Sequence, residues 1–337
     1  MAPGRSRGMR FGVAALATLT AAALTSACNR DEAGKAGAFP SRNVEIMVPA
    51  APGGGWDITA RSMQKVLRDD KIVNKPVQVY NVPGSGGTIG LSQLVSKEKG
   101  DPHKLMMCGL VMVGAIETSK AKTDLTKVTP IATLTAEAEA IVVPAKSKYQ
   151  NLTQLVDDLK KNPKSVAWGG GSVGGSDHIV AGLIAKAAGV NPAQIKYVGY
   201  SGGGEATAAI LSGNVTAGIS GVSEFEDQIK AGKMRLLAVT SPKSIDVAGK
   251  PAPTIKDAGL DVELMNWRAI VAPPGISDGE RDDVVAVIDK LHESDGWKKT
   301  LEDRGWDDFY KTGDDAKKFI ADETTRIKAL IKELGTA

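Results

Sequence analysis

Four glycine-rich stretches contain the residues of this sequence best suited to contact a small molecule. They read "PAAPGGGWD" from Pro49, "NVPGSGGTIG" from Asn81, "WGGGSVGGSDH" from Trp168 and "YSGGGEATAA" from Tyr200. Each stretch follows a short β-type run and precedes a helical pattern, so each is expected to be a turn that opens into a helix. Glycine permits positive φ and lets a ligand approach the main chain closely.

The chemistry expected at these turns is anion binding by backbone N–H groups. The first N–H groups of a helix have no intrahelical partner and carry a partial positive charge. Nearby hydroxyl groups add donors, at Ser85, Thr88, Ser172, Ser176 and Ser201. No Lys or Arg occurs in residues 49–57, 83–90, 169–178 or 199–206. Because a carboxylate needs fewer donors than a phosphate, the pattern favours a carboxylate ligand.

Acidic residues stand at or just before the expected helix starts, at Asp57, Asp177 and Glu205. The favoured interpretation is that each caps or favourably charges the first turn, worth about 1 kcal/mol. The alternative is that they face the ligand, where they would repel a carboxylate and attract an ammonium group or a bridging water. His178 is expected to be a donor or a helix-start residue rather than a general base.

An enzymatic use of the turns has less support. Gly169–Gly174 match the G-x-G-x-x-G pattern, but no acidic residue stands at the expected distance and no G-x-x-x-x-G-K-[ST] run occurs. The three histidines lie far apart without metal-ligand spacing, and no G-x-S-x-G elbow is present. We expect no catalytic residue, metal or cofactor. A nucleotide-dependent enzyme is the alternative from another class.

Charge and composition indicate a globular protein without a nucleic-acid partner. The 337 residues suffice for two lobes of ordinary size. The formal net charge is +3, no long basic block occurs, and aromatic residues make up only 4%. A nucleic-acid site would need a basic face and stacking aromatics.

Residues 1–28 have the pattern of a lipoprotein signal peptide. Three arginines precede the apolar run Phe11–Leu24, which is too short to span a bilayer comfortably, and small residues lead to Cys28. Acylated Cys28 would anchor the protein to the outer face of the cell membrane. A plain secretory signal and a periplasmic protein are the alternative, because Leu24 stands four rather than three residues before Cys28. Residues 29–43 are predicted to be a flexible tether, and Cys108 a small buried hydrophobe.

From Val44 onward, strand and helix patterns alternate, which predicts an α/β fold with mainly parallel sheets. Predicted strands are Val44–Val48, Val77–Val82, Leu105–Leu110, Ile141–Val143, Val166–Trp168, Tyr197–Tyr200, Ala217–Ser220, Leu236–Thr240 and Ala269–Ala272. Predicted helices are Ile58–Asp69, Leu152–Lys161, His178–Ala188, Glu205–Leu211, Asp278–Glu293 and Asp314–Leu334. Two glycine-rich turns fall in each half, which suggests two similar lobes facing each other across a cleft. Ligands of open α/β sheets bind outside the carboxyl ends of the strands, where these turns lie.

Six segments in order resemble the extracytoplasmic receptors of tripartite tricarboxylate transporters, the Bug-type receptors. They are "IMVPAAPGGGWDITAR", "VYNVPGSGGTIG", "WGGGSVGGSDHIVAGLIAKAAG", "YVGYSGGGEATAAILSGNVTAGI", "RLLAVTSPKS" and "PAPTIKDAGLDVELMNWRAIVAPPGIS". The resemblance covers the chain from about Val44 to the C-terminus. It implies a two-lobed periplasmic-binding-protein-like fold (type II) that closes on a small carboxylate and delivers it to a two-component membrane permease.

The resemblance also implies lobe boundaries and site residues. Lobe one would comprise residues 44–140 plus 266–337 and lobe two residues 141–265, with crossings near Ile141–Pro144 and Asn266–Ala269. The turns would supply Gly53, Gly54, Gly55, Trp56, Ser85, Gly86, Ser172, Ser176, Tyr200 and Ser201 as ligand-binding residues. Their neighbours Asp57, Gly87, His178 and Gly202, and Arg268 outside the turns, complete the expected set.

Two of these residues bear on specificity. Trp56 would shape or stack on the pocket, or alternatively cover the lobe surface. Arg268 would pair bidentately with a distal carboxylate, or alternatively form an ordinary salt bridge. A tricarboxylate such as citrate is the favoured ligand. The alternatives are a C4 or C5 dicarboxylate, an aromatic carboxylate or an amino acid, and the receptor is expected to be a monomer.

Overall fold

The computed structural model of the protein describes residues 39–201 and 203–335. The predicted signal peptide, Cys28, most of the tether and Gly202 lie outside the described residues. The strands are β1 (Val44–Val48), β2 (Val77–Asn81), β3 (Lys104–Gly109), β4 (Thr129–Pro144), β5 (Ala167–Gly170), β6 (Lys196–Gly199), β7 (Ala217–Gly221), β8 (Met234–Val239), β9 (Asp246–Val247), β10 (Lys250–Pro251), β11 (Met265–Ala272) and β12 (Asp307–Thr312). The helices are α1 (Gly55–Asp69), α2 (Thr88–Lys97), α3 (Leu110–Ser119), α4 (Leu152–Lys161), α5 (Ser176–Ala187), α6 (Gly203–Leu211), α7 (Val222–Lys230), α8 (Asp278–Glu293), α9 (Asp295–Arg304) and α10 (Gly313–Leu334).

Ten of the strands form one mixed sheet. Its order is β2-β1-β3-β11-β4-β7-β5-β6, and β8 and β12 also pair with β4. The outer strands are parallel, since β1 pairs in parallel with β2 and β3, and β5 with β6 and β7. The pairings of β4 and β11 are antiparallel, so the sheet is less parallel than the sequence predicts. The reason is that β4 leaves the first half of the sheet and β11 returns to it, so the two run in opposite directions.

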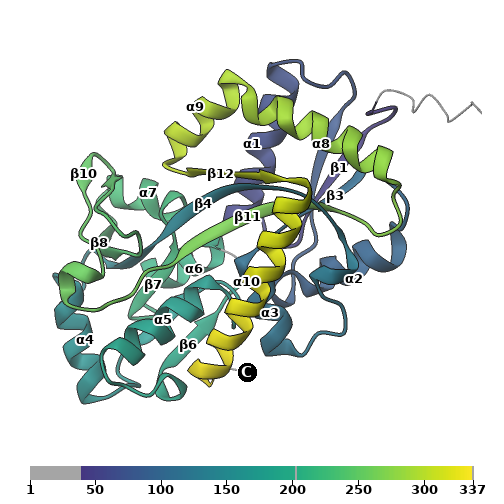
Figure 1. Cartoon of the computed structure of the whole chain (residues 1–337). Coiled ribbons are helices and arrows are strands. Elements are labelled where there is room, and N and C mark those ends of the chain that lie inside the picture. The colour runs from purple at the N-terminus through teal and green to yellow at the C-terminus, as the bar shows by residue number, and fades with distance from the viewer. Residues whose placement is uncertain (1–38, 202, 336–337) are drawn as a thin grey trace, which may run out of the picture. The chain divides into compact units, whose positions relative to one another are not determined.

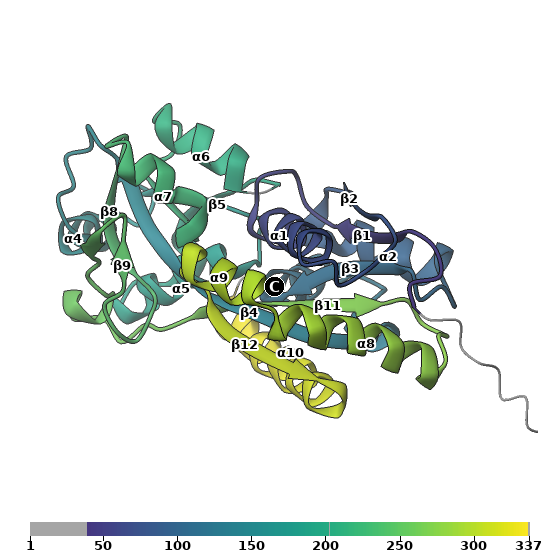
Figure 2. The same ribbon diagram turned by 90° about the horizontal axis from the view of Figure 1, so that it is seen from above.

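Strand β4 connects the two halves of the sheet. Its residues 129–138 pair with β11, and residues 139–144 pair with β7 and β8. Figures 1 and 2 show β4 and β11 running side by side between a group that contains β1, β2, β3 and α1 and a group that contains β5, α6 and α7. The crossings predicted near residues 141–144 and 266–269 therefore fall on these two strands.

Local sequence explains where several helices begin. Asn151 accepts the N–H of Gln154 at the start of α4, and Ser277 forms a capping box with Glu280 at the start of α8. Both helices have the predicted bounds. The helices α3, α7 and α9 were not predicted from the sequence, and α2 was expected after the second glycine-rich turn but without bounds. In α3, "LVMVGAIETS", apolar residues surround the first two turns and are mostly buried, so the helix lacks the amphipathic period that marks a surface helix.

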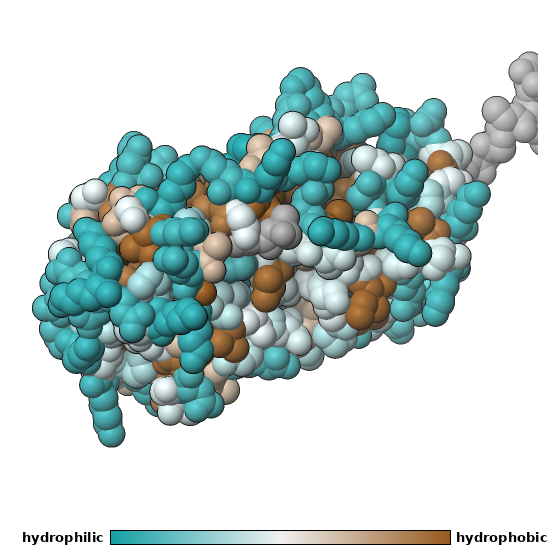
Figure 3. All heavy atoms as spheres, turned by 90° about the horizontal axis from the view of Figure 1, so that it is seen from below, coloured by the Kyte–Doolittle hydropathy of each residue, from teal (hydrophilic) through white to brown (hydrophobic). Residues whose placement is uncertain are grey.

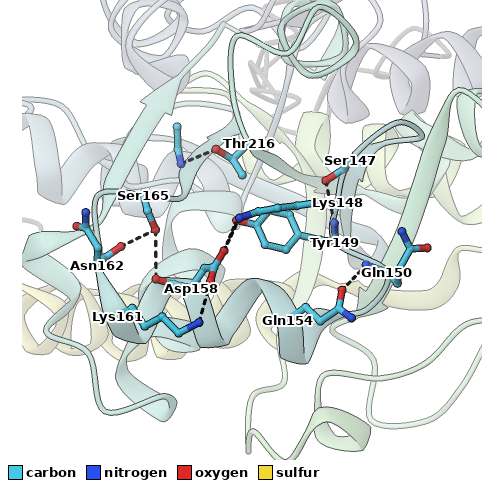
Figure 4. Close-up of polar contacts among 11 residues, drawn as sticks. Ser147, Lys148, Tyr149, Gln150, Gln154, Asp158, Lys161, Asn162, Ser165 and Thr216 are labelled. Atoms are coloured by element: carbon cyan, nitrogen blue, oxygen red, sulfur yellow. Dashed lines mark hydrogen bonds and ion pairs between the residues drawn. The ribbon is translucent and has the colours of Figure 1, made fainter.

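A polar cluster holds the connection between β4 and α4 (Figure 4). The carboxylate of Asp158 accepts hydrogen bonds from Nζ of Lys148 at 2.7 Å and from the Tyr149 hydroxyl at 3.1 Å. Lys161, one turn further along α4, adds a contact at 3.3 Å. These partners lower the pKa of Asp158 to about 2, through the bond from Lys148 first. The cluster anchors α4 to the chain that leads into it.

The described end of the predicted tether packs on the folded domain. The N–H of Ser41 donates to Nε2 of His103 at 3.2 Å, and the Phe39 ring lies 4.9 Å from the His103 ring. Arg42 forms an ion pair with Asp101. Residues 39–42 therefore pack on the folded domain, and the prediction of a flexible tether is wrong for them.

Exposed apolar side chains are few and scattered on the surface of the described residues. Figure 3 shows one face of the molecule, on which apolar side chains lie in small separate groups among polar ones. The large apolar side chains that are well exposed are Ile89, Val173 and Leu211, among the residues described. Within residues 39–201 and 203–335, no helix combines the length and the apolar character needed to cross a bilayer.

Candidate functional site

A cleft of about 450 Å³ opens where the four glycine-rich turns meet. The β1–α1 and β2–α2 turns line it from one half of the sheet, together with α3. The β5–α5 and β6–α6 turns line it from the other half, together with residues of β7 and α7. Strand β11 contributes Asn266 and Arg268. Turns that are up to about 150 residues apart in the sequence are thus brought to one site.

The structure places most of the predicted ligand-binding residues at this cleft. Those that line it are Gly54, Gly55, Trp56, Ser85, Gly86, Ser172, Tyr200, Ser201 and Arg268. Those that do not line it are Gly53, Asp57, Gly87, Ser176 and His178. Trp56 is 6% exposed, so its ring forms part of the cleft wall rather than a cover on the outer surface.

Two of the three consecutive glycines of the first turn, Gly53 and Gly55, are required for different structural reasons. Gly53 has φ +83°, a backbone conformation that a residue with a side chain adopts at a cost. Gly55 begins α1, and a Cβ atom there would lie 2.3 Å from Nη2 of Arg268. Its N–H donates to Oε1 of Glu224 at 2.9 Å. The group that comes close to the Gly55 backbone is therefore the protein's own Arg268–Glu224 region.

At three of the four glycine-rich turns, those before α1, α5 and α6, a carboxylate of the chain itself accepts a backbone N–H group. Asp57 accepts the N–H of Gly53 at 3.0 Å, and Glu205 accepts the N–H of Ser201 at 3.0 Å. Asp177 accepts the N–H of Gly171 in a short hydrogen bond. Together with Glu224, which accepts the N–H of Gly55, these contacts occupy four backbone donors. These four donors are not available to a ligand carboxylate, which has to use others.

Hydroxyl groups supply such donors from both sides of the cleft. Ser85 lies on the side of α1 and α2, whereas Ser172, Tyr200 and Ser201 lie on the opposite side. Their four hydroxyl groups have no hydrogen-bond partner among the described residues. The Ser176 hydroxyl is different, because it is buried and donates to Oδ1 of Asp177 at 2.8 Å.

Arg268 lines the cleft but is already paired. It is 1% exposed and forms an ion pair with Glu137, whose exposure is also 1%. Its guanidinium lies 5.3 Å from the centroid of the Trp306 ring. The ordinary salt bridge, one of the two alternatives for Arg268, is therefore what the structure shows.

Sequence reasoning missed a group of polar residues on the inner wall of the cleft. Glu224 and Asn266 line the cleft, and Glu137 and Glu139 lie buried on β4 beside it. The alternation "AEAEA" at residues 136–140 was the available signal, because a period of two places both glutamates on one face of a strand. Burial raises the pKa of Glu224 to about 8, and burial likewise raises the pKa of Glu139 and of Asp177.

His178 and Cys108 are buried in the protein and do not line the cleft. Nδ1 of His178 accepts the N–H of Gly174 at 3.1 Å, and its ring stacks on Tyr197 with centroids 4.3 Å apart. Burial lowers the pKa of His178 to about 4, so the ring is neutral at neutral pH. Cys108 is buried, as predicted, and burial raises its pKa to about 12.

The G-x-G-x-x-G stretch is shaped by internal packing. A Cβ atom on Gly170 would lie 2.6 Å from the Tyr197 hydroxyl, and the Gly171 N–H is bound by Asp177. The Asp177 carboxylate therefore occupies a donor that a dinucleotide phosphate would require. In the part of the chain that the structure describes, no group of three or more His, Cys, Asp or Glu side chains could hold a metal ion.

A cleft between glycine-rich strand ends, with β4 and β11 crossing beneath it, is the arrangement of a two-lobed solute-binding protein of the periplasmic-binding-protein type. Solved structures share this fold. A structure described as a periplasmic transporter has a TM-score of 0.80 and 26% identity, covering 88% of this chain and 98% of that one. MatC from Rhodopseudomonas palustris with bound malate has a TM-score of 0.78 and 21% identity, covering 87% and 100%. A second R. palustris protein, with adipate, has a TM-score of 0.77 and 20% identity, covering 88% and 98%.

Sequence comparison defines the family. The family described as "Tripartite tricarboxylate transporter family receptor" matches residues 59–336. A Pseudomonas sp. (strain P51) protein encoded in the tcbD–tcbE intergenic region is 30% identical over 94% of this chain and 93% of its own length. The protein BugT of Bordetella pertussis is 28% identical over 88% and 90%. The chain belongs to the tripartite tricarboxylate transporter receptor family, and is an extracytoplasmic solute-binding receptor rather than an enzyme.

Proposed function

We propose that the cleft captures a small carboxylate, which the receptor then delivers to its membrane permease. The observation that carries this proposal is the convergence of four unpartnered hydroxyl groups, from Ser85, Ser172, Tyr200 and Ser201, on one cleft. Hydroxyl groups donate well to carboxylate oxygens, and such charge-assisted bonds are stronger than neutral ones. The malate and adipate of the two R. palustris structures, both dicarboxylates, support a ligand of this class.

The cleft volume fits a ligand of this size, since small-molecule sites range from about 300 to 1,000 Å³. Citrate is less well supported than the sequence suggests. The reason to favour a tricarboxylate was a free Arg268 for the distal carboxylate, and Glu137 already engages that arginine. We therefore propose a carboxylate without a requirement for three charges.

We further propose that the two lobes, residues 44–140 plus 266–337 and residues 141–265, close over the ligand. The crossing strands β4 and β11 would then act as the hinge. In this structure the two sides already touch, since the N–H of Ala51 donates to the Ser201 carbonyl at 3.3 Å and a Cβ atom on Gly86 would lie 3.3 Å from Cβ of Ser172. We also propose that the receptor is a monomer held at the membrane by acylated Cys28.

The test is a thermal-shift screen of the purified chain with citrate, malate, succinate, adipate, aromatic carboxylates, amino acids and NAD. A carboxylate at a hundredfold excess over its Kd should stabilise the protein by about 2.7 kcal/mol. The variant Ser85→Ala/Ser172→Ala removes one hydroxyl from each side, and should weaken binding by about 1.5–3 kcal/mol per lost bond to a charged group. Ser96→Ala is the matched control, because its hydroxyl donates to the Ser92 carbonyl on α2, away from the cleft. Unchanged melting with every carboxylate would contradict the proposal.

A further inference from the structure

The helix α3 contains a glycine whose closest neighbour lies in the opposite half of the sheet. Gly114 stands in the middle of this helix, where glycine costs stability relative to alanine. A Cβ atom at position 114 would lie 1.8 Å from the carbonyl oxygen of Gly174, in the β5–α5 turn. The next side chain is that of Ile331 on α10, which lies beside α3 (Figure 1), and its flexible end, Cδ1, would be 3.3 Å away. The β5–α5 turn therefore explains this glycine better than the packing of α3 within its own half does.

The β5–α5 turn has the matching requirement. Gly174 has φ +81°, and a Cβ atom on it would lie 2.4 Å from Oγ1 of Thr118, one turn along α3 from Gly114. A Cβ atom on the next residue, Gly175, would lie 3.1 Å from Cγ1 of Val111, also on α3. The glycines thus let two backbone segments from opposite halves of the sheet touch, and a side chain at position 114 or 174 would separate them.

The turn is held in place by its own half of the sheet. The N–H of Gly174 donates to Nδ1 of His178 at 3.1 Å, and the N–H of Gly175 donates to the Ser172 carbonyl at 2.9 Å. The His178 ring is fixed in turn by stacking on Tyr197. Because the turn is fastened in this way, a methyl group added on α3 is accommodated by moving the two halves apart rather than by reshaping the turn.

The contact can open without leaving a polar group unpaired. The Thr118 hydroxyl lies 3.3 Å from the Val173 carbonyl oxygen, and 3.1 and 3.4 Å from two carbonyl oxygens of its own helix. Its single hydrogen therefore keeps an acceptor on α3 when Val173 moves away. An ion pair between Lys186 on α5 and Glu333 on α10 also joins the two halves, but the side chains are 48% and 54% exposed, so it contributes little.

We propose that Gly114 and Gly174 form the contact on which the two lobes close, and that this contact sets the ligand affinity although neither glycine lines the cleft. This inference rests on the proposed function and names positioning residues for the same cleft. The contact borders the cleft, since Val111, Thr118 and Val173 line it. A ligand held by groups of both lobes binds tightly only while the lobes are together, so its apparent affinity falls with the fraction of closed molecules. A methyl group at the contact therefore weakens binding without touching the ligand.

The experiment compares Gly114→Ala with the unmodified chain in lobe separation and in ligand affinity. Spin labels at Ser96→Cys on α2 and Ser212→Cys at the end of α6, in a chain that also carries Cys28→Ser, report the separation by pulsed electron–electron double resonance. Both serines are exposed, and the remaining cysteine, Cys108, is buried. The separation is measured with and without malate, succinate, adipate and citrate, and calorimetric titration with the same four probes measures the affinity.

We expect Gly114→Ala to lengthen the label separation relative to the unmodified chain under the same conditions. It should raise the Kd of each probe that binds by about tenfold or more, because the closed state is disfavoured. The melting temperature without a probe should change little, whereas a purely structural role would lower it and leave separation and Kd unchanged. Gly279→Ala is the matched control, because it lies in the first turn of α8 with nothing within 4 Å of an added Cβ atom.

A second variant separates the two neighbours of position 114. Gly114→Ala/Ile331→Val removes Cδ1 of Ile331, the neighbour on α10, and leaves the Gly174 carbonyl where it is. The longer separation and the weaker binding should persist in this double variant. Recovery of both readouts would assign the effect to packing against α10 and overturn the inference. Failure of both variants to fold would overturn it as well, because the glycine would then be required for folding rather than for closure.

The outcomes distinguish this inference from the proposed function. If a probe binds the unmodified chain and Gly114→Ala changes neither readout, or only one, the inference is overturned and the carboxylate receptor stands. An absence of binding by every probe and by the wider panel of carboxylates contradicts the proposed function. The label separation of Gly114→Ala then decides alone whether the glycine contact controls closure, and an unchanged separation overturns the inference too.

Discussion

Replacing Gly55 by alanine tests whether position 55 is a glycine because the side chain of Arg268 leaves no room for a Cβ atom. A Cβ atom at position 55 would lie 2.3 Å from Nη2 and 2.7 Å from Cζ of Arg268. Arg268 is 1% exposed and paired with Glu137, so its guanidinium has little freedom to move away. Overpacking of a buried site costs about 1–3 kcal/mol. Alanine in a helix gains about 0.5–1 kcal/mol over glycine, which leaves a net loss of about 1–2 kcal/mol.

The measurement is urea unfolding of Gly55→Ala beside Gly279→Ala. Gly279 is the matched control, because it also lies in the first turn of a helix, lacks a positive φ and has nothing within 4 Å of an added Cβ atom. The helix gain alone should therefore stabilise Gly279→Ala by about 0.5–1 kcal/mol. Equal stabilisation by the two substitutions would refute the packing argument. The glycine at position 55 would then be explained by close approach of the ligand to the backbone.

Three further predictions concern stability and location. Arg268→Leu should lower the free energy of unfolding by about 3–5 kcal/mol, because it leaves the Glu137 carboxylate buried and unpaired. Urea unfolding measures this loss, and a loss below about 1 kcal/mol would be inconsistent with an ion pair that excludes water. The raised pKa of Glu224 means that the folded state binds this proton more tightly than the unfolded chain, so its contribution to the unfolding free energy is present below about pH 4.5 and is lost as the pH rises to about 8. Glu224→Gln should remove this part of the pH dependence, and identical pH profiles of variant and unmodified protein would exclude it. Cys28→Ser should release the exported receptor from the membrane fraction, as fractionation would show, and full retention would rule out a lipid anchor on Cys28.

The sequence predicted much of the fold because amphipathic helices and apolar strands have clear periods. The helices α4 and α8 and the strand β1 have the predicted bounds. The helix α3 was missed because its first turns are apolar on nearly every side. Most of β4 was missed as well, since "AEAEA" at residues 136–140 has the composition of a helix and only its period of two marks a strand. The antiparallel centre of the sheet depends on which strand crosses between the halves, a property of topology rather than of local pattern.

The sequence predicts where the site lies but not which of its groups are free to donate a hydrogen bond to a ligand. Glycine turns at strand ends identify the cleft, because strand ends of an α/β sheet gather at one edge. What fills the N–H groups of those turns depends on partners that can lie far away in the chain. Glu224 accepts the N–H of Gly55, which is 169 positions away in the sequence, and no local pattern predicts that contact. Capping by Asp57 and Asp177, four and six positions from the N–H groups they accept, was within reach of sequence reasoning.

The occupied N–H groups change what the cleft can select. Backbone donors are the same in every turn, so a receptor that relied on them would distinguish carboxylates mainly by length. Here the chain's own carboxylates accept backbone N–H groups in three of the four turns, whereas the hydroxyl groups of Ser85, Ser172, Tyr200 and Ser201 have no partner among the described residues. Side-chain hydroxyls stand at different positions in the different turns. They therefore give the cleft a means of selecting among carboxylates that identical backbone groups do not supply.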